Sequence, residues 1–72
     1  MTAGNALAMA MRAAVCCLWT VSFEPDHAKT PSLHSWVVSM RRGDDSLSCC
    51  FGGDDMAALS ADWIREVIRT RG

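Results

Sequence analysis

The sequence lacks a surplus of charge of either sign. Seven basic side chains stand against eight acidic ones, so the formal net charge is −1. A chain without a strong field of one sign is not drawn onto phosphate backbones or anionic lipid. We therefore expect no direct binding to nucleic acid or to a membrane.

The sequence also lacks a hydrophobic run long enough to span a bilayer. A spanning helix needs about 20 consecutive apolar residues, and Arg12 divides the apolar stretch 6–23 into shorter pieces. A secretory leader is not expected either, because no Lys or Arg precedes the stretch and Val15, before Cys16, is larger than the small residue usual at a cleavage site. We expect a cytoplasmic protein whose thiols stay reduced.

Catalytic motifs and nucleotide-binding loops are missing as well. His27 and His34 show none of the spacing to Ser, Cys or Asp that marks a catalytic triad. A chain of 72 residues with 50% hydrophobic residues is long enough for one folded domain, 1–72, and too apolar for disorder. The sequence thus predicts a folded, non-enzymatic protein with no cofactor.

What is present is a series of changing periodicities. Residues 3–14 are rich in Ala with apolar residues at four-residue steps, which indicates a helix. Over 15–23, β-branched, aromatic and Cys residues alternate, which predicts a strand that ends at 24–26 around Pro25. Alternation over 33–41 and 46–51, with turn residues at 42–45 between them, predicts a hairpin.

The last part of the sequence has the pattern of an amphipathic helix. Gly52 and Gly53 break the third strand, and Asp54 and Asp55 offer a helix cap. Ser60 is an alternative cap. The expected apolar stripe consists of Met56, Leu59, Trp63, Ile64, Val67 and Ile68.

Together the elements predict an α+β fold. It is a small two-layer domain, in which a three-stranded antiparallel sheet is packed by the C-terminal amphipathic helix, with a short N-terminal helix as an optional element. The order of three strands, a Gly-Asp-Asp turn and an amphipathic helix resembles the partial RNase H-like domain of HicB-type antitoxins. We carry no functional residue over from that resemblance.

Two doublets, Cys16-Cys17 and Cys49-Cys50, hold all four cysteines. Neighbouring residues of a strand project to opposite faces, so a doublet cannot easily aim both sulfurs at one metal ion. We expect Cys17 and Cys49 in the core and Cys16 and Cys50 on the other face. A structural zinc module that combines Cys with His27 or His34 is the alternative, and a disulfide or redox use of the thiols also stays open.

Paired acidic residues are the candidate partner-binding groups. Their first role is in turn formation and helix capping. If both places are exposed, they also form local negative clusters that could mimic nucleic acid toward a basic partner. The residues are Asp44, Asp45, Asp54 and Asp55.

By elimination, the sequence favours a small protein-interaction module. We expect it to bind and block a larger protein or nucleoprotein complex, as the anti-CRISPR proteins and antitoxins of phages and mobile elements do. Homodimer formation is a further expectation, because the first strand is apolar on both faces and an unprotected edge invites pairing.

Overall fold

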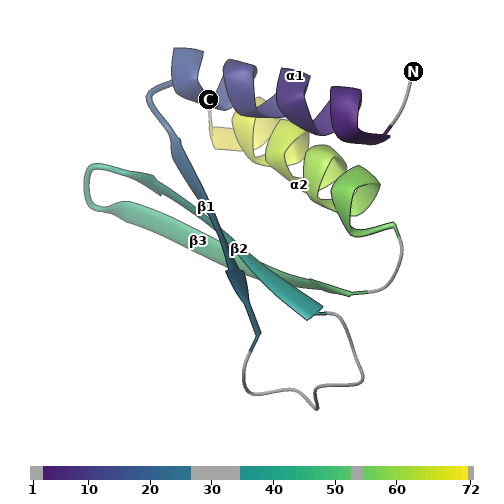
Figure 1. Ribbon diagram of the computed structural model, residues 1–72. Coiled ribbons are helices and arrows are strands. Elements are labelled where there is room, and N and C mark those ends of the chain that lie inside the picture. Colours follow the sequence, from purple (N-terminus) through teal and green to yellow (C-terminus); the bar gives the residue numbers. More distant parts are fainter. Residues whose placement is uncertain (1–2, 27–34, 53–54, 72) are drawn as a thin grey trace.

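The chain folds into a sheet with two helices on one of its faces. The structure is a computed structural model that describes residues 3–26, 35–52 and 55–71. Its elements are α1 (Ala3–Cys16), β1 (Thr20–Pro25), β2 (Ser35–Arg42), β3 (Asp45–Gly52) and α2 (Met56–Arg71). The strands form one antiparallel sheet in the order β1-β2-β3, and both helices cover the same face (Figure 1). The predicted α+β two-layer fold is confirmed, and the N-terminal helix is longer than expected.

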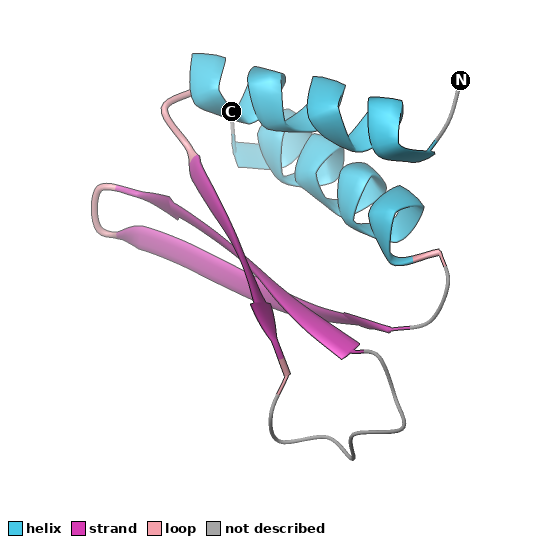
Figure 2. Ribbon diagram, in the orientation of Figure 1, coloured by secondary structure: helices cyan, strands magenta, loops and turns pink. Residues whose placement is uncertain are grey.

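A tight turn joins β2 to β3. Arg42 and Asp45 face each other at the end of the ladder, which leaves Gly43 and Asp44 as the loop. Gly43 has a φ of 60°, and Asp44 is not among the residues with positive φ. Gly at the first loop position with an ordinary second residue is the arrangement of a type II′ turn, whose twist matches that of the strands. The predicted hairpin is thus confirmed (Figure 2).

The two faces of the sheet differ in polarity. Val38 and Met40 of β2 are fully buried beneath the helices, and the register places Val21, Phe23, Leu47, Cys49 and Phe51 on the same face. The opposite face has no helix over it. It carries Thr20, Ser22, Glu24, Val37, Ser39, Arg41, Ser46, Ser48 and Cys50. Hydrophobic and polar residues therefore alternate along the strands, as expected where one face packs on the core.

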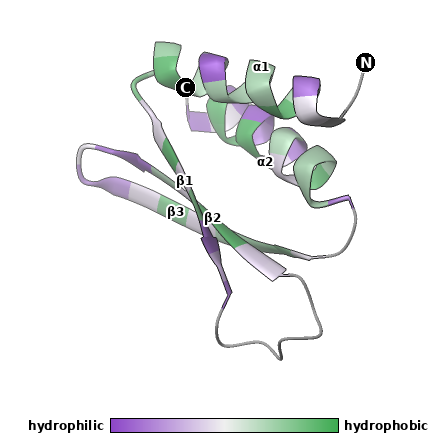
Figure 3. Cartoon of the chain, viewed as in Figure 1, coloured by the Kyte–Doolittle hydropathy of each residue, from purple (hydrophilic) through white to green (hydrophobic). Residues whose placement is uncertain are grey.

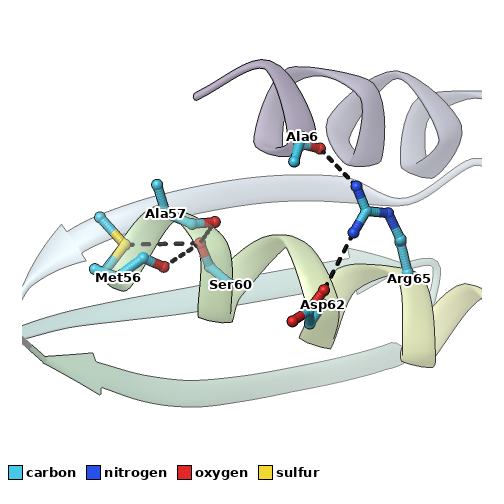
Figure 4. Close-up of polar contacts among 6 residues, drawn as sticks. All are labelled: Ala6, Met56, Ala57, Ser60, Asp62 and Arg65. Atoms are coloured by element: carbon cyan, nitrogen blue, oxygen red, sulfur yellow. Dashed lines mark hydrogen bonds and ion pairs between the residues drawn. The ribbon is translucent and has the colours of Figure 1, made fainter. Parts of the chain in front are cut away.

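The helices pack closely because small side chains separate them. Ala10 and Ala14 of α1 and Ala61 of α2 are all buried in the core. Arg65 adds a polar link, since its guanidinium donates to the backbone oxygen of Ala6 at 3.3 Å (Figure 4). The helix layer is therefore one unit. Within the described residues, neither helix is long and apolar enough to cross a membrane.

One prediction for α2 is wrong in detail, whereas its predicted start next to Asp55 is confirmed. Leu59 was assigned to the core stripe but is 48% exposed, because the buried face turns toward α1 and consists of Ser60, Ala61, Ile64 and Val67. The alternative cap, Ser60, is not used. It lies inside the helix, where its hydroxyl donates to the backbone oxygen of Met56 at 2.7 Å (Figure 4). The helix begins after Asp55, whose backbone oxygen accepts from the Leu59 N–H at 3.0 Å.

The prediction that the first strand spans 15–23 is also wrong. Helix α1 continues through Cys16, and β1 begins only at Thr20. Ala13 and Ala14 have the highest helix propensity, so the local backbone preference overrides the alternation of the side chains. The strand ends at Pro25, within the predicted end at 24–26.

Candidate interaction surface

The connection between α1 and β1 is a capped helix end with an unusual residue in it. The Trp19 N–H donates to the Ala14 oxygen at 2.8 Å, and the Leu18 N–H donates to the Val15 oxygen at 3.0 Å. These two bonds define a Schellman motif, whose cap residue takes the left-handed conformation and is usually Gly. Here that residue is Leu18, with a φ of 68°. A side chain at this position costs about 1–2 kcal/mol of backbone strain.

Trp19 anchors the connection to the core. Its side chain is 1% exposed and lies in one cluster with Ala14, which gives the apolar contact that commonly accompanies this motif. The guanidinium of Arg42 lies over the Trp19 ring at 4.4 Å from its centroid and also donates to the Arg71 oxygen at 2.8 Å. The Trp19 indole Nε1–H is buried and has no hydrogen-bond acceptor among the described residues. The connection between α1 and β1 is therefore held in place by Trp19. It nevertheless carries two unfavourable features, the backbone strain of Leu18 and the buried Trp19 N–H.

An exposed apolar surface surrounds Leu18. Leu18 is 78% exposed and Val15 is 67% exposed, which are the highest values among the large hydrophobic residues of the described chain. They line a groove of about 410 Å³ with Met11 and Val21, and we call these four residues the α1–β1 apolar surface. Hydrophobic colour marks the last turn of α1 and the connection that follows it (Figure 3). Large apolar groups exposed together are typical of binding sites.

A positive charge stands at the edge of this surface. Arg12 and Cys16 join Met11 and Val15 around an adjoining hollow of about 450 Å³. No acidic residue lines either hollow, and Arg12 forms no ion pair within the described part of the chain. The surface thus combines an apolar centre with one cation at its rim.

Two arginines of α2, by contrast, form ion pairs within their own helix. Arg65 binds Asp62 at 3.1 Å, as the spacing on the helix predicts. Arg69 binds Glu66, and its hydrogen bond lowers the pKa of the Glu66 carboxyl, while the same bond raises the pKa of Arg69. These pairs are exposed and contribute little to stability.

The predicted acidic residues do not form one site. Asp44 is exposed in the hairpin turn, whereas Asp45 is half-buried and accepts a bond from Arg71 at 2.8 Å. Asp55 is exposed at the start of α2, and Asp54 lies outside the described residues. Asp45 contacts the C-terminal end of α2, whereas Asp55 precedes its first residue, so a helix about 24 Å long lies between these two residues.

The predicted placement of the cysteines is confirmed only in part, because Cys16 lies at the end of α1 and not on the open face of the sheet. Cys49 faces the helix layer and Cys50 the open face of β3, while Cys17 packs against the core and Cys16 is exposed at the end of α1. All four are free thiols. Within residues 3–26, 35–52 and 55–71, no three His, Cys, Asp or Glu side chains come close enough to hold a metal ion. The zinc alternative depended on His27 or His34, which lie outside these ranges.

Sequence reasoning missed the α1–β1 apolar surface. Its signal is the spacing of Met11, Val15 and Leu18 at steps of four and three, which is a helical stripe. Because Val15 was assigned to a strand with Trp19 and Val21, the stripe was divided between two elements. Comparison of the chain with protein-family models, with curated proteins and with solved structures finds no match, so the resemblance to HicB-type antitoxins receives no support there.

Proposed function

We propose that this protein is a non-enzymatic interaction module that binds and blocks a larger macromolecular partner. Small inhibitors of phages and mobile elements, such as anti-CRISPR proteins and antitoxins, are proteins of this type. The observation that supports the proposal is Leu18, which is strained, exposed and surrounded by other apolar groups.

The burial energy of Leu18 and Val15 and the backbone strain of Leu18 both support the proposal. Complete burial of a Leu or Val side chain is favourable by about 1.5–3 kcal/mol, and a side chain that is mostly exposed obtains little of this within its own chain. At Leu18 the folded chain in addition bears the strain of a left-handed backbone. A partner that covers Leu18 and Val15 would recover the burial energy of both residues. Residues that break local rules without benefit to the fold are the ones where function is expected.

The acidic residues have a secondary place in this proposal. Asp44 and Asp55 are exposed at opposite ends of the domain and can steer a basic partner during approach. Asp45 is already neutralised in part by Arg71. Charge reversal of Asp44 and Asp55 should therefore slow association at low salt and leave dissociation nearly unchanged.

Leu18→Gly is the decisive variant, because it removes the apolar side chain and the strain together. We expect wild-type protein, immobilised in a lysate of its source cells, to retain one protein at near-equal molar amount. Leu18→Gly should lower that retention at least tenfold, as loss of about 1.4 kcal/mol of binding energy implies. Leu59→Ser is the matched control, since Leu59 is also an exposed apolar residue but lies on α2. Equal retention by Leu18→Gly and wild type, or no stoichiometric protein in repeated captures, would contradict the proposal.

A further inference from the structure

The hydrogen bonds of β1 show which of its backbone groups have no partner in the part of the chain that the structure describes. Asp26 continues the register in which Pro25 faces Trp36, and its N–H donates to the oxygen of Ser35 directly opposite, at 3.0 Å. In an antiparallel ladder, hydrogen-bonded pairs alternate with pairs that are not bonded to each other. The bonded residues of β1 are therefore Asp26, Glu24, Ser22 and Thr20.

The intervening residues point their backbone groups away from β2. Val21 and Phe23 each present an N–H and a C=O at the outer edge of β1, and Pro25 presents a C=O. Pro25 lacks an N–H but loses no ladder bond, because it occupies one of these outward positions. The pairing of β1 with β2 contains no bulge, and no charged side chain of β1 itself points toward the helix face. Pro25 protects only the last position of this edge, so the outward groups of Val21 and Phe23 stay available to an added strand.

The α1–β1 apolar surface lies beside this edge. A strand that pairs with β1 would run about 4.8 Å from it, and every second side chain would point to the helix side of the sheet. Those side chains would enter the groove lined by Met11, Val15, Leu18 and Val21. The free backbone groups and the groove are therefore complementary to one kind of ligand, which is an extended chain with apolar residues at alternate positions.

We propose that the partner contributes an extended segment that pairs with the outer edge of β1. Its alternate side chains are apolar and fill the groove beneath α1, and an acidic residue on the same side meets Arg12. The proposal rests on the proposed function and specifies how the partner binds. The preference for an acidic residue in the partner segment follows from the surface itself, where Arg12 is the charged group and no acidic residue lines the hollows.

A second copy of the chain fits this edge less well. Its own β1 would offer Val21 and Phe23 at alternate positions, which suits the groove. The acidic residue of that strand, Glu24, belongs to the opposite set and faces the side of the sheet without helices. Pairing of two β1 strands would therefore leave Arg12 without a counter-charge, so we assign the edge to a different protein.

The test is a selection from a library of random 12-residue peptides displayed on phage, with the full chain immobilised. We expect enriched peptides to alternate apolar residues and to carry an acidic residue. Val21→Pro removes an outward N–H without breaking a bond of the sheet, and Val21→Ala is its matched control because the N–H remains. Enriched peptides should bind Val21→Pro about tenfold more weakly than Val21→Ala. Arg12→Ser should weaken the acidic peptides selectively.

Hydrogen exchange of the wild-type protein provides a readout that needs no variant. The amides of Val21 and Phe23 should exchange rapidly in the free protein and slowly with a bound peptide. This measurement decides the question where Val21→Pro fails to fold.

Three outcomes would overturn the edge pairing. They are enriched peptides without alternation, equal binding by the Pro and Ala variants, and unprotected amides in the complex. A dimer mass in light scattering that Val21→Pro abolishes would assign the edge to a second copy instead. Partner capture that is lost with Leu18→Gly and kept with Val21→Pro would leave the proposed function intact while refuting this mode of binding.

Discussion

We expect the Leu18→Gly variant to be more stable than the Leu18→Ala variant, which is the reverse of the order usual for these two residues. Leu18 has a φ of 68° and is 78% exposed, so its side chain contributes little packing. Both substitutions remove the same exposed side chain beyond Cβ. They differ in the backbone, because only Gly adopts a left-handed conformation without steric cost.

The magnitude follows from two opposing terms. Relief of the left-handed strain favours Gly over Ala by about 1–2 kcal/mol. The greater freedom of Gly in the unfolded chain opposes this by about 0.5–1 kcal/mol. We therefore expect Leu18→Gly to be more stable than Leu18→Ala by about 0.5–1 kcal/mol, which corresponds to about 4 °C in Tm for a domain of this size.

Urea unfolding followed by Trp fluorescence measures this difference, with equal m-values as the condition for comparison. At an exposed position inside a helix, Gly is instead less stable than Ala by about 1 kcal/mol. If Leu18→Ala is the more stable variant, Leu18 does not occupy a left-handed cap. Backbone strain then no longer supports the α1–β1 apolar surface as a binding site.

Two further predictions concern contacts away from the surface. Arg42→Lys should lower the free energy of unfolding by about 1–2 kcal/mol, because Lys cannot both stack on Trp19 and reach the Arg71 oxygen; Arg41→Lys, on the open face of the sheet, should have almost no effect and serves as control. Glu66→Gln should lower Tm only slightly at neutral pH, because Arg69 depresses the pKa of Glu66, which stabilises the fold above its unfolded pKa, but the pair is exposed. The difference should shrink as pH falls through the depressed pKa of Glu66, and a difference that does not change with pH would show that the ion pair is not its cause.

The parts of the fold that could be predicted are those with local signals that agree with their packing. Gly43 supplies the turn of the hairpin, and the alternation of Val38 and Met40 with polar residues indicates one buried face. Asp55 before the apolar stripe of α2 marks the start of that helix. In each case propensity, pattern and tertiary contact favour the same structure.

The errors occur where these signals conflict. Residues 15–23 alternate as a strand does, but Ala13 and Ala14 extend the helix, and the residue that stops it is Leu where Gly is typical. Leu59 fits the three- and four-residue spacing of the apolar stripe of α2, which predicts that it is buried. Contact with α1 changes which face of α2 is buried, so the small Ser60 is buried and Leu59 is exposed. Neither result can be read from periodicity, because both depend on a contact between distant segments.

The misassigned segment and the candidate surface coincide for a physical reason. A Gly at position 18 would end α1 without strain and would have marked the helix end in the sequence. Leu serves neither the cap, which it strains, nor the core, from which it projects. Its apolar side chain is therefore available for contact with another molecule, near the N–H groups of Val21 and Phe23 that point away from β2. The same residue that hides the helix end from sequence analysis is the one whose burial by a partner would be most favourable.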